Sequence, residues 1–197
     1  MRTELPDLRQ RVAGRVRGLR AARRLPLGAL AARSGVSRSM ISRIERGEVS
    51  ATAVVLERLA HGLGVVLGAL FEAPAAARPA APVVRRADQP VWRDPGSGYL
   101  RRAVSPPGVA QPMQITEVVF PAGGRVAFDS AERATRVYQQ IWVLAGTIDF
   151  TAGAERHRLR QGDCLALVLD RPTVFHNPTR RAARYAVIIV SEAPPPP

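Results

Sequence analysis

The run of prolines and alanines at residues 73–82, APAAARPAAP, constrains the fold of this chain most. Its side chains offer little to bury, and each proline restricts its own backbone and that of the residue before it. Apolar residues recur with helical spacing before this run and in short strand-like groups after it. We therefore expect two domains, at residues 1–72 and 83–191, joined by a linker at 73–82 and followed by a proline-rich tail at 192–197.

The first part of the chain has the pattern of about five short helices. Apolar residues recur at helical spacing in segments such as Leu8–Leu19 and Val55–Leu63. Serines or a proline stand where helices begin, and glycines stand where left-handed caps are expected: Pro26, Ser37 and Ser50, then Gly35, Gly47 and Gly64. This pattern predicts an all-α bundle.

The second part has the pattern of an all-β domain. Short runs rich in Val, Ile, Phe and Tyr are separated by turn residues that contain glycine or Asn-Pro. The expected strands are residues 115–120, 138–144, 147–151, 156–159, 164–169 and 184–190. An antiparallel sandwich or barrel follows from strands of this length and spacing.

Charge and composition limit the classes of partner. The 29 basic residues are all arginine, and the formal net charge is +13. A GC-rich genome alone favours arginine, but the positive field still attracts polyanions, so nucleic acid is the leading partner class. The single cysteine excludes an internal disulfide. No stretch is apolar over the length of a membrane span, and we expect no secretory signal because residues 1–10 carry acids and no continuous apolar run. We therefore expect a soluble cytoplasmic protein with no membrane partner.

Residues 27–46, LGALAARSGVSRSMISRIER, predict a helix, a tight turn at 34–36 and a second helix capped by Ser37. This is a helix-turn-helix. Ile41 and Ile44 of the second helix would face the core, and its polar residues would lie on the other side: Arg38, Ser39, Ser42 and Arg43. Arginine can bind guanine O6 and N7 in the major groove in a bidentate way, so this face fits duplex DNA. The alternative is a bundle that packs against another protein, with solvated arginines.

The segments SGVSRSMISRIERG at 34–47, LERLAHGLGV at 56–65 and LGALF at 67–71 resemble the phage-repressor-like XRE family. The resemblance implies that Arg38, Ser39 and Arg43 contact base edges. It also implies that Ser37 and Arg46 approach phosphates and that Arg20 pairs with a structural Glu45. The chain departs from the family at Pro26 and Val66, where a capping hydroxyl is usual.

The second part resembles a cupin, a double-stranded β-helix barrel, through PAGGRV at 121–126, YQQIWVLAGTIDF at 138–150, RLRQGDCLAL at 158–167 and RPTVFHNP at 171–178. A helix-turn-helix joined to one cupin implies a one-component transcription regulator. Metal-binding cupins use histidines and a glutamate at positions that here are Gln139, Thr173 and residues 132–135. Because these are poor metal donors, we expect no metal and no cofactor.

Strand alternation places Thr173 and Phe175 inside the barrel and His176 outside it, unless a bulge before Asn177 turns His176 inward. Glu132 could be a lone ligand if its loop folds inward. The barrel mouth could hold a small-molecule effector, with these candidate residues: Gln139, Ile141, Val143, Thr173 and Phe175. The alternative for them is a filled apolar core with no ligand.

Two side chains of the β-domain have other expected roles. Trp142 has the opposite parity to Ile141 and would pack between sheets or across a subunit boundary. Cys164 begins a strand and is expected to be a buried, inert thiol, with a redox sensor as the alternative.

The expected function is that of a homodimeric transcription regulator that binds operator DNA through residues 1–72 and senses a metabolite in residues 83–191. Two recognition helices supply usable specificity, whereas one supplies few base contacts. No activation surface is visible, which favours repression. The alternatives are an antitoxin-like protein that binds DNA and a partner protein, and a cupin enzyme with an accessory helical domain. Without metal ligands, catalysis is not expected.

Overall fold

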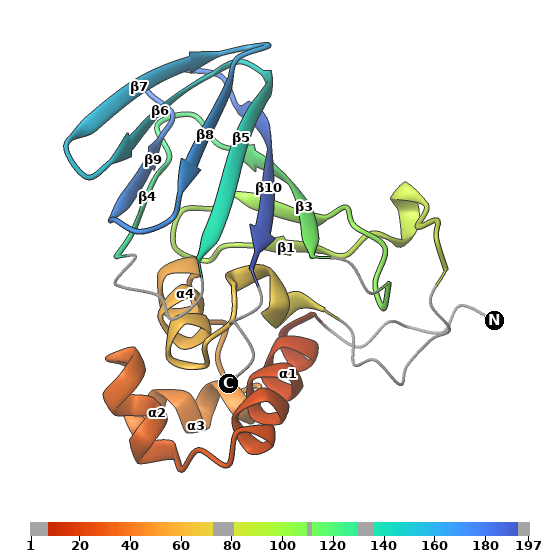
Figure 1. Cartoon of the computed structure of the whole chain (residues 1–197), viewed down its shortest axis with the longest axis vertical. Coiled ribbons are helices and arrows are strands. Elements are labelled where there is room, and N and C mark those ends of the chain that lie inside the picture. The colour runs from red at the N-terminus through yellow and green to blue at the C-terminus, as the bar shows by residue number, and fades with distance from the viewer. Residues whose placement is uncertain (1–7, 73–80, 110–111, 130–135, 193–197) are drawn as a thin grey trace. The chain divides into compact units, whose positions relative to one another are not determined.

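The computed structural model describes residues 8–72, 81–109, 112–129 and 136–192 (Figure 1). The chain divides into two compact units, Met1–Val83 with Pro106–Val109 and Val84–Ser105 with Ala110–Pro197. Most of the predicted linker, residues 73–80, and most of the predicted tail, residues 193–197, lie outside the described residues. In the described part of the chain, no helix is long and apolar enough to cross a membrane.

The first unit is a small helical bundle. It contains α1 (Leu8–Ala22), α2 (Leu27–Ser34), α3 (Arg38–Glu45), α4 (Ala53–Gly62) and a 3-10 helix, η1 (Leu67–Phe71). Each helix contributes fully buried side chains to one core, which includes Val16, Leu30, Ile41, Leu56 and Leu70. The helical part of the predicted fold is therefore confirmed, with the fifth helix as a single 3-10 segment.

Local signals fix where these helices begin and end. Ser37 caps α3 by accepting a hydrogen bond from the Met40 amide, as predicted. The prediction for Ser50 is wrong, because Thr52 caps α4 and accepts from Val55. Gly35 ends α2 with a φ of 65°, which favours glycine.

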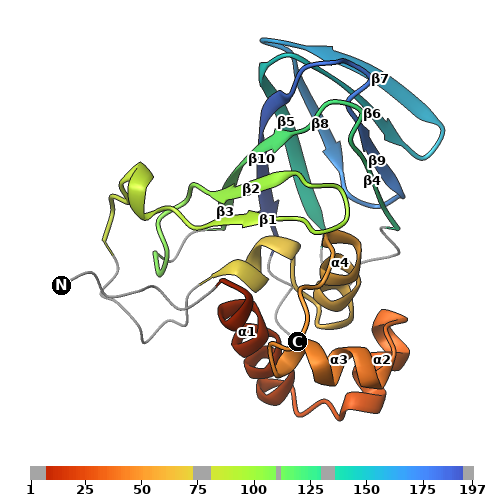
Figure 2. The ribbon, with the colours of Figure 1, turned by 180° about the vertical axis from the view of Figure 1, so that it is seen from behind.

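The second unit consists of two antiparallel sheets (Figures 1 and 2). The six-stranded sheet has the order β1-β2-β3-β10-β5-β8, and the four-stranded sheet has the order β4-β9-β6-β7. Short 3-10 helix η2 (Arg86–Asp88) precedes them. The strands are β1 (Val91–Arg93), β2 (Leu100–Ala103), β3 (Met113–Phe120), β4 (Arg125–Phe128), β5 (Val137–Ala145), β6 (Thr147–Ala152), β7 (Glu155–Arg160), β8 (Cys164–Val168), β9 (Thr173–His176) and β10 (Ala183–Ser191).

The six strands predicted from sequence are confirmed within two residues at each end, and the two-part fold is confirmed with them. Four short strands, β1, β2, β4 and β9, are not among the six because each is only three or four residues long; β1, β2 and β4 also carry arginines. Alternation along β5 is strict: Gln139, Ile141 and Val143 are buried, and the residues between them are exposed. The core of this unit therefore lies on the Ile141 side of the six-stranded sheet.

Candidate functional site

Helix α3 is amphipathic, with one polar, exposed side and one apolar, buried side. Ile41 and Ile44 are at most 2% exposed and anchor the helix in the core, as predicted. The predicted DNA-contacting side chains lie on the remaining surface of α3 and just beyond its ends. Ser37, Arg38, Ser39, Arg43 and Arg46 are exposed, and Ser42 is half-buried. Two hydroxyls, Ser37 Oγ and Ser39 Oγ, lie 3.1 Å apart. The face therefore carries three arginines and three hydroxyls within ten residues.

A buried ion pair fixes α3 against α1. Arg20 Nε donates to Glu45 Oε1 at 2.6 Å, and Nη2 donates to Oε2 at 2.9 Å. The third donor, Nη1, binds the Leu25 carbonyl at 2.9 Å, so the guanidinium joins three segments. Side-chain exposure is 19% for Arg20 and 8% for Glu45. The hydrogen bond from Arg20 to Glu45 raises the pKa of Arg20. The pair implied by the family resemblance is confirmed, and it sets the angle of α3.

Glu48, in the turn after α3, was missed by sequence reasoning. Its carboxylate accepts from Arg46 Nε at 2.5 Å and from Arg46 Nη2 at 3.0 Å, and lies 3.9 Å from Arg43 Nε. Arg46 also donates to Ser42 Oγ. The Arg46 hydrogen bonds lower the pKa of Glu48. Glu48 therefore binds the Arg46 guanidinium, which is the group expected to contact a phosphate. The sequence signal for this ion pair was an acidic residue two positions after Arg46.

The five predicted effector residues are all buried between the sheets. Gln139, Ile141 and Val143 come from β5, and Thr173 and Phe175 come from β9, each with 6% exposure or less. Phe175 stacks on Tyr185 with ring centroids 5.7 Å apart and meets Phe150 edge-on at 4.8 Å. Burial raises the pKa of Tyr185 well above its usual value. The aromatic part of this interior is thus well packed.

Three polar side chains in the same interior have no hydrogen-bond partner among the residues that the structure describes. Gln139 is 5% exposed, Thr173 is 2% exposed and Thr116, on β3, is 5% exposed. Within the described residues, no hydrogen bond from another residue reaches the side chain of any of the three. Buried amides and hydroxyls are normally hydrogen-bonded to protein or water, and leaving one unpaired costs about 1–3 kcal/mol. These groups can therefore bind water or a polar ligand.

The residues do not fit a metal. Among the described residues, no group of three or more His, Cys, Asp or Glu side chains could hold an ion. His176 pairs in register with Asp149 and Arg125, on the face of the four-stranded sheet opposite Phe175. Glu132 lies outside the described residues. The interior donors, an amide and hydroxyls, are weak ligands for transition metals.

Asp149 lies beside His176 under two arginines of β7. Its side chain is 3% exposed, and it accepts from Arg158 Nε at 2.8 Å and from Arg156 Nη2 at 2.6 Å. These hydrogen bonds, Arg158 first, lower the pKa of Asp149 to about 2. Asp149 therefore neutralises part of an otherwise basic sheet face.

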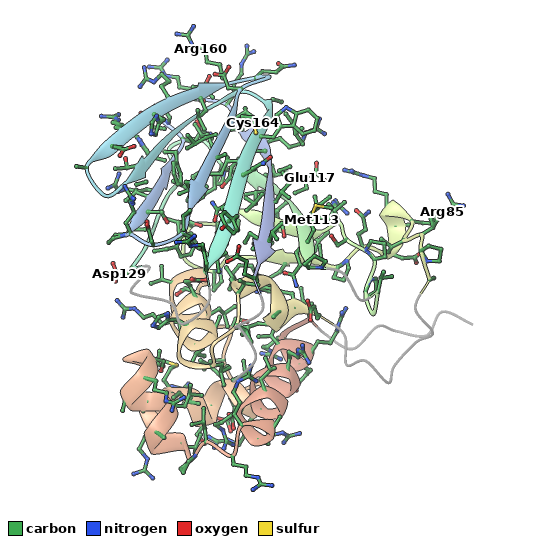
Figure 3. All side chains as sticks on the ribbon, viewed as in Figure 1. Arg85, Met113, Glu117, Asp129, Arg160 and Cys164 are labelled. Atoms are coloured by element: carbon green, nitrogen blue, oxygen red, sulfur yellow. The ribbon has the colours of Figure 1, made fainter. Side chains whose placement is uncertain are left out.

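One prediction for the β-unit is wrong, and one of the two roles expected for Trp142 is excluded. Cys164 is exposed rather than buried, because β8 is the edge strand of its sheet. Trp142 does not pack between the sheets: it is 49% exposed on the outer side of β5. Figure 3 labels Cys164, together with Met113 and Glu117 of β3 in the same sheet.

Comparison with known proteins supports the two-part organisation. A helix-turn-helix domain family model matches residues 11–73. An HTH_3 family transcriptional regulator from Vibrio cholerae has a similar structure, with a TM-score of 0.75 and 24% identity over 94% of this chain and 98% of that one. No curated protein sequence matches.

Two other structures are less similar. Hydroxypropylphosphonic acid epoxidase from S. wedmorenis has a TM-score of 0.47 and 19% identity over 91% of this chain and 96% of its own. The Cupin_2 domain of an XRE family regulator from Enterobacter cloacae has a TM-score of 0.44 and 14% identity over 48% of this chain and 98% of its own. At TM-scores below 0.5, neither likeness bears on function. The chain thus carries a helix-turn-helix domain at residues 11–73, followed by two antiparallel sheets, and shares its fold with the HTH_3 family regulator from Vibrio cholerae.

Proposed function

We propose that this protein is a sequence-specific, DNA-binding transcription regulator of the cytoplasm, most simply a repressor. The observation that carries the proposal is the polar face of α3, in which Arg38, Ser39 and Arg43 are exposed on a helix anchored by Ile41 and Ile44. A recognition helix that lies in the major groove contacts bases through exposed polar side chains of this kind. The positive charge of the chain supports binding to phosphates.

The residues of this face have separable roles. Arg38 and Arg43 would contact guanine edges, and Ser42 would assist either base or phosphate contact. Ser37 and Arg46 would bind phosphates at the two ends of α3. A base contact changes the preference among sequences, whereas a phosphate contact changes affinity for all sequences.

The experiment begins with selection of bound fragments from a random DNA pool. Arg38→Ala or Arg43→Ala should then cost about 1–3 kcal/mol on the selected operator and relax the preference at one base pair. Arg46→Ala should weaken all sequences alike. Arg17→Ala removes the same charge from an exposed position of α1 and is the control. If both base-contacting variants bind operator and random DNA as the wild type does, the proposal fails.

We further propose that the interior of the β-unit binds a small, uncharged polar effector. The support is a set of three buried side chains that have no partner in the described part of the chain, Gln139, Thr116 and Thr173, beside an apolar wall that includes Ile141. An amide and two hydroxyls can donate and accept hydrogen bonds but carry no charge, so they suit carbonyl, hydroxyl or amide groups. Ligand binding would shift the relative populations of two arrangements of the DNA-binding parts.

Gln139→Leu tests this proposal. Replacing an unpartnered amide with a similar apolar side chain should leave the free protein as stable or up to about 1 kcal/mol more stable. Thermal unfolding with a panel of uncharged metabolites should then show stabilisation of the wild type that the variant lacks. Ile141→Val, in the same wall, is the control for packing. If Gln139→Leu unfolds at a much lower temperature, Gln139 is satisfied in the free protein and the effector proposal fails.

The antitoxin-like alternative makes a different prediction. A pull-down with a protein of that kind would recover one protein partner in stoichiometric amount. Its affinity for DNA would change when that partner binds and would not change with a metabolite.

A further inference from the structure

Charged side chains are distributed unevenly along the four-stranded sheet of the second unit. At one end, the strands and the loop after β9 carry five exposed arginines: Arg125, Arg158, Arg160, Arg180 and Arg181. The other end carries three exposed acids and two exposed arginines: Asp129, Glu155, Asp170, Arg156 and Arg171. Figure 3 labels Arg160 at the first of these ends and Asp129 at the second. We call the first end, defined by its five arginines, the basic sheet end.

The strand register places arginines on both edges of the sheet. Arg125 of β4 pairs with His176 of β9. In the same row, Asp149 of β6 pairs with His176 and with Arg158 of β7. Because β4 and β7 are the edge strands and neighbouring strands lie about 4.8 Å apart, the backbones of Arg125 and Arg158 are about 14 Å apart. Arg160 follows on the same face of β7, two residues after Arg158.

The loop between β9 and β10 adds two arginines beside this row. It starts at Asn177, whose backbone amide donates to the Gly124 carbonyl at 2.9 Å, next to Arg125. The fully buried Asn177 side chain donates to the Arg181 carbonyl at 2.8 Å and accepts from the Thr179 amide at 3.0 Å. A buried amide therefore fixes the loop backbone, while both arginine side chains of the loop are exposed.

Most arginines of the basic sheet end have no acidic partner. In the described part of the chain, four of the five guanidiniums make no hydrogen bond or ion pair: those of Arg125, Arg160, Arg180 and Arg181. The fifth, Arg158, donates to Asp149, and Asp149 is shared with Arg156. Asp163 accepts from the backbone amide of Arg160 at 2.8 Å. Five arginines and the two aspartates leave this end with a formal net charge of +3, with histidine neutral.

The chemistry of this end suits phosphates better than a protein surface. Guanidinium groups bind phosphate oxygens in a bidentate way. A protein interface needs an apolar centre with large anchors, whereas the outward positions of this sheet include only two apolar residues, Ala127 and Val174. Interfaces with DNA are polar and strongly positive. The major groove is about 12 Å wide, so arginines about 14 Å apart on the two sheet edges can approach its two backbones.

We infer that the basic sheet end binds the phosphate backbone of duplex DNA, independently of base sequence. The inference goes beyond the proposed function, because it assigns a second DNA-binding surface to the unit that does not contain α3. It does not rest on base recognition by that helix. Charged residues also protect edge strands from pairing with other chains, but such protection does not require the acids to lie at the opposite end of the sheet.

The test compares double variants of the full chain that lose the same charge. Arg125→Gln/Arg160→Gln removes two of the five guanidiniums of the basic sheet end. Arg85→Gln/Arg93→Gln removes two exposed arginines of the same unit and is the control. Figure 3 labels Arg85 far from Arg160. Both variants should unfold in urea as the wild type does, as judged by fluorescence, because both tryptophans lie in this unit.

Affinity for a random-sequence duplex is then measured over a range of salt concentrations. Each lost phosphate contact reduces the slope of log affinity against log salt by about 0.9, so the basic-end variant should have a slope shallower by about 1.8. It should bind about tenfold or more weakly at about 0.1 M salt. The control should stay within about twofold, because charges more than about 10 Å from the phosphates are largely screened at that salt. Arg180→Gln/Arg181→Gln should repeat the basic-end result, and it remains informative if the first variant is unstable.

The outcomes separate this inference from base recognition by α3. The basic-end variants should weaken binding to operator and random duplex by the same factor, whereas α3 variants change the ratio between the two affinities. Wild-type affinity and salt slope in both basic-end variants would overturn the inference and leave the proposed function intact. Polyglutamate that displaces the duplex from the wild type at an equal concentration of charge would also overturn it, because the basic sheet end would then suit an acidic protein. Shallower slopes in the basic-end variants, together with α3 variants that bind normally, would support the inference and refute the proposed function.

Discussion

The ion pair between Arg20 and Glu45 offers a quantitative test of how α3 is held. Arg20→Ala removes both hydrogen bonds that Arg20 donates to the Glu45 carboxylate, whose side chain is 8% exposed in the intact pair. Breaking a buried pair by removing one partner costs about 3–5 kcal/mol, and the 19% exposure of Arg20 admits some water, so we expect about 2–4 kcal/mol.

Arg15 provides a matched control on the same helix. It also donates to a backbone carbonyl, Ala69 O at 2.9 Å, and to a carboxylate, Glu72 at 3.0 Å. This pair is more exposed, at 26% and 41%. We therefore expect Arg15→Ala to cost about 1 kcal/mol, since exposed pairs contribute about 0.2–1 kcal/mol and a carbonyl hydrogen bond about as much. Helix propensity cancels because both substitutions introduce alanine into α1.

The assay separates the two units spectroscopically. Both tryptophans and all three tyrosines lie in the second unit, so fluorescence reports the β-unit, whereas circular dichroism at 222 nm is dominated by the helices. In urea, Arg20→Ala should move the dichroism transition and leave the fluorescence transition in place. Equal costs for Arg15→Ala and Arg20→Ala, or equal shifts in both signals, would refute the reasoning about burial and placement.

Three further outcomes follow from the same contacts. Asp149 has a folded pKa of about 2 against an ordinary 3.8, so its stabilisation is fully present above pH about 4 and is lost as the pH falls toward 2. The loss is at most about 2 kcal/mol, and in Asp149→Asn the fluorescence-detected stability should lack this pH dependence while that of wild type shows it. Glu48→Gln should raise affinity for every DNA sequence about threefold, because it removes one screened charge roughly 7 Å from the phosphates and releases Arg46. Glu155→Gln, an exposed acid of β7, should change that affinity little in the same titration. Elemental analysis of the purified protein should find no stoichiometric transition metal. One metal ion per chain would contradict the conclusion that the amide and hydroxyl groups of the β-unit interior are too weak as ligands to hold one.

The sequence predicted the features that depend on local physics. Ser37 as a cap, Ile41 and Ile44 as core residues and the alternation along β5 all follow from periodicity and hydrogen-bonding chemistry. The Arg20–Glu45 pair required the family resemblance, because 25 residues separate the partners and no local signal joins them.

The features that sequence reasoning missed depend on tertiary context. Whether Cys164 is buried depends on β8 being an edge strand, and strand order is not encoded locally. Ser50 and Thr52 both carry a hydroxyl that can cap a helix, so the sequence alone does not choose between them. Thr52 is the cap because α4 begins at Ala53. Arg101 of β2 is 8% exposed, so a strand that was not predicted contributes a buried side chain.

Guanine methylation interference is the most direct test of the claim that α3 recognises bases in the major groove. Methylation of guanine N7 blocks the bidentate contact of an arginine, so wild type should fail to bind operator methylated at a few specific guanines. Arg38→Ala should become insensitive to methylation at one of them and Arg43→Ala at another, while Arg17→Ala keeps the wild-type pattern. Interference that is identical in all four proteins, or that is absent at every guanine N7, would contradict the account.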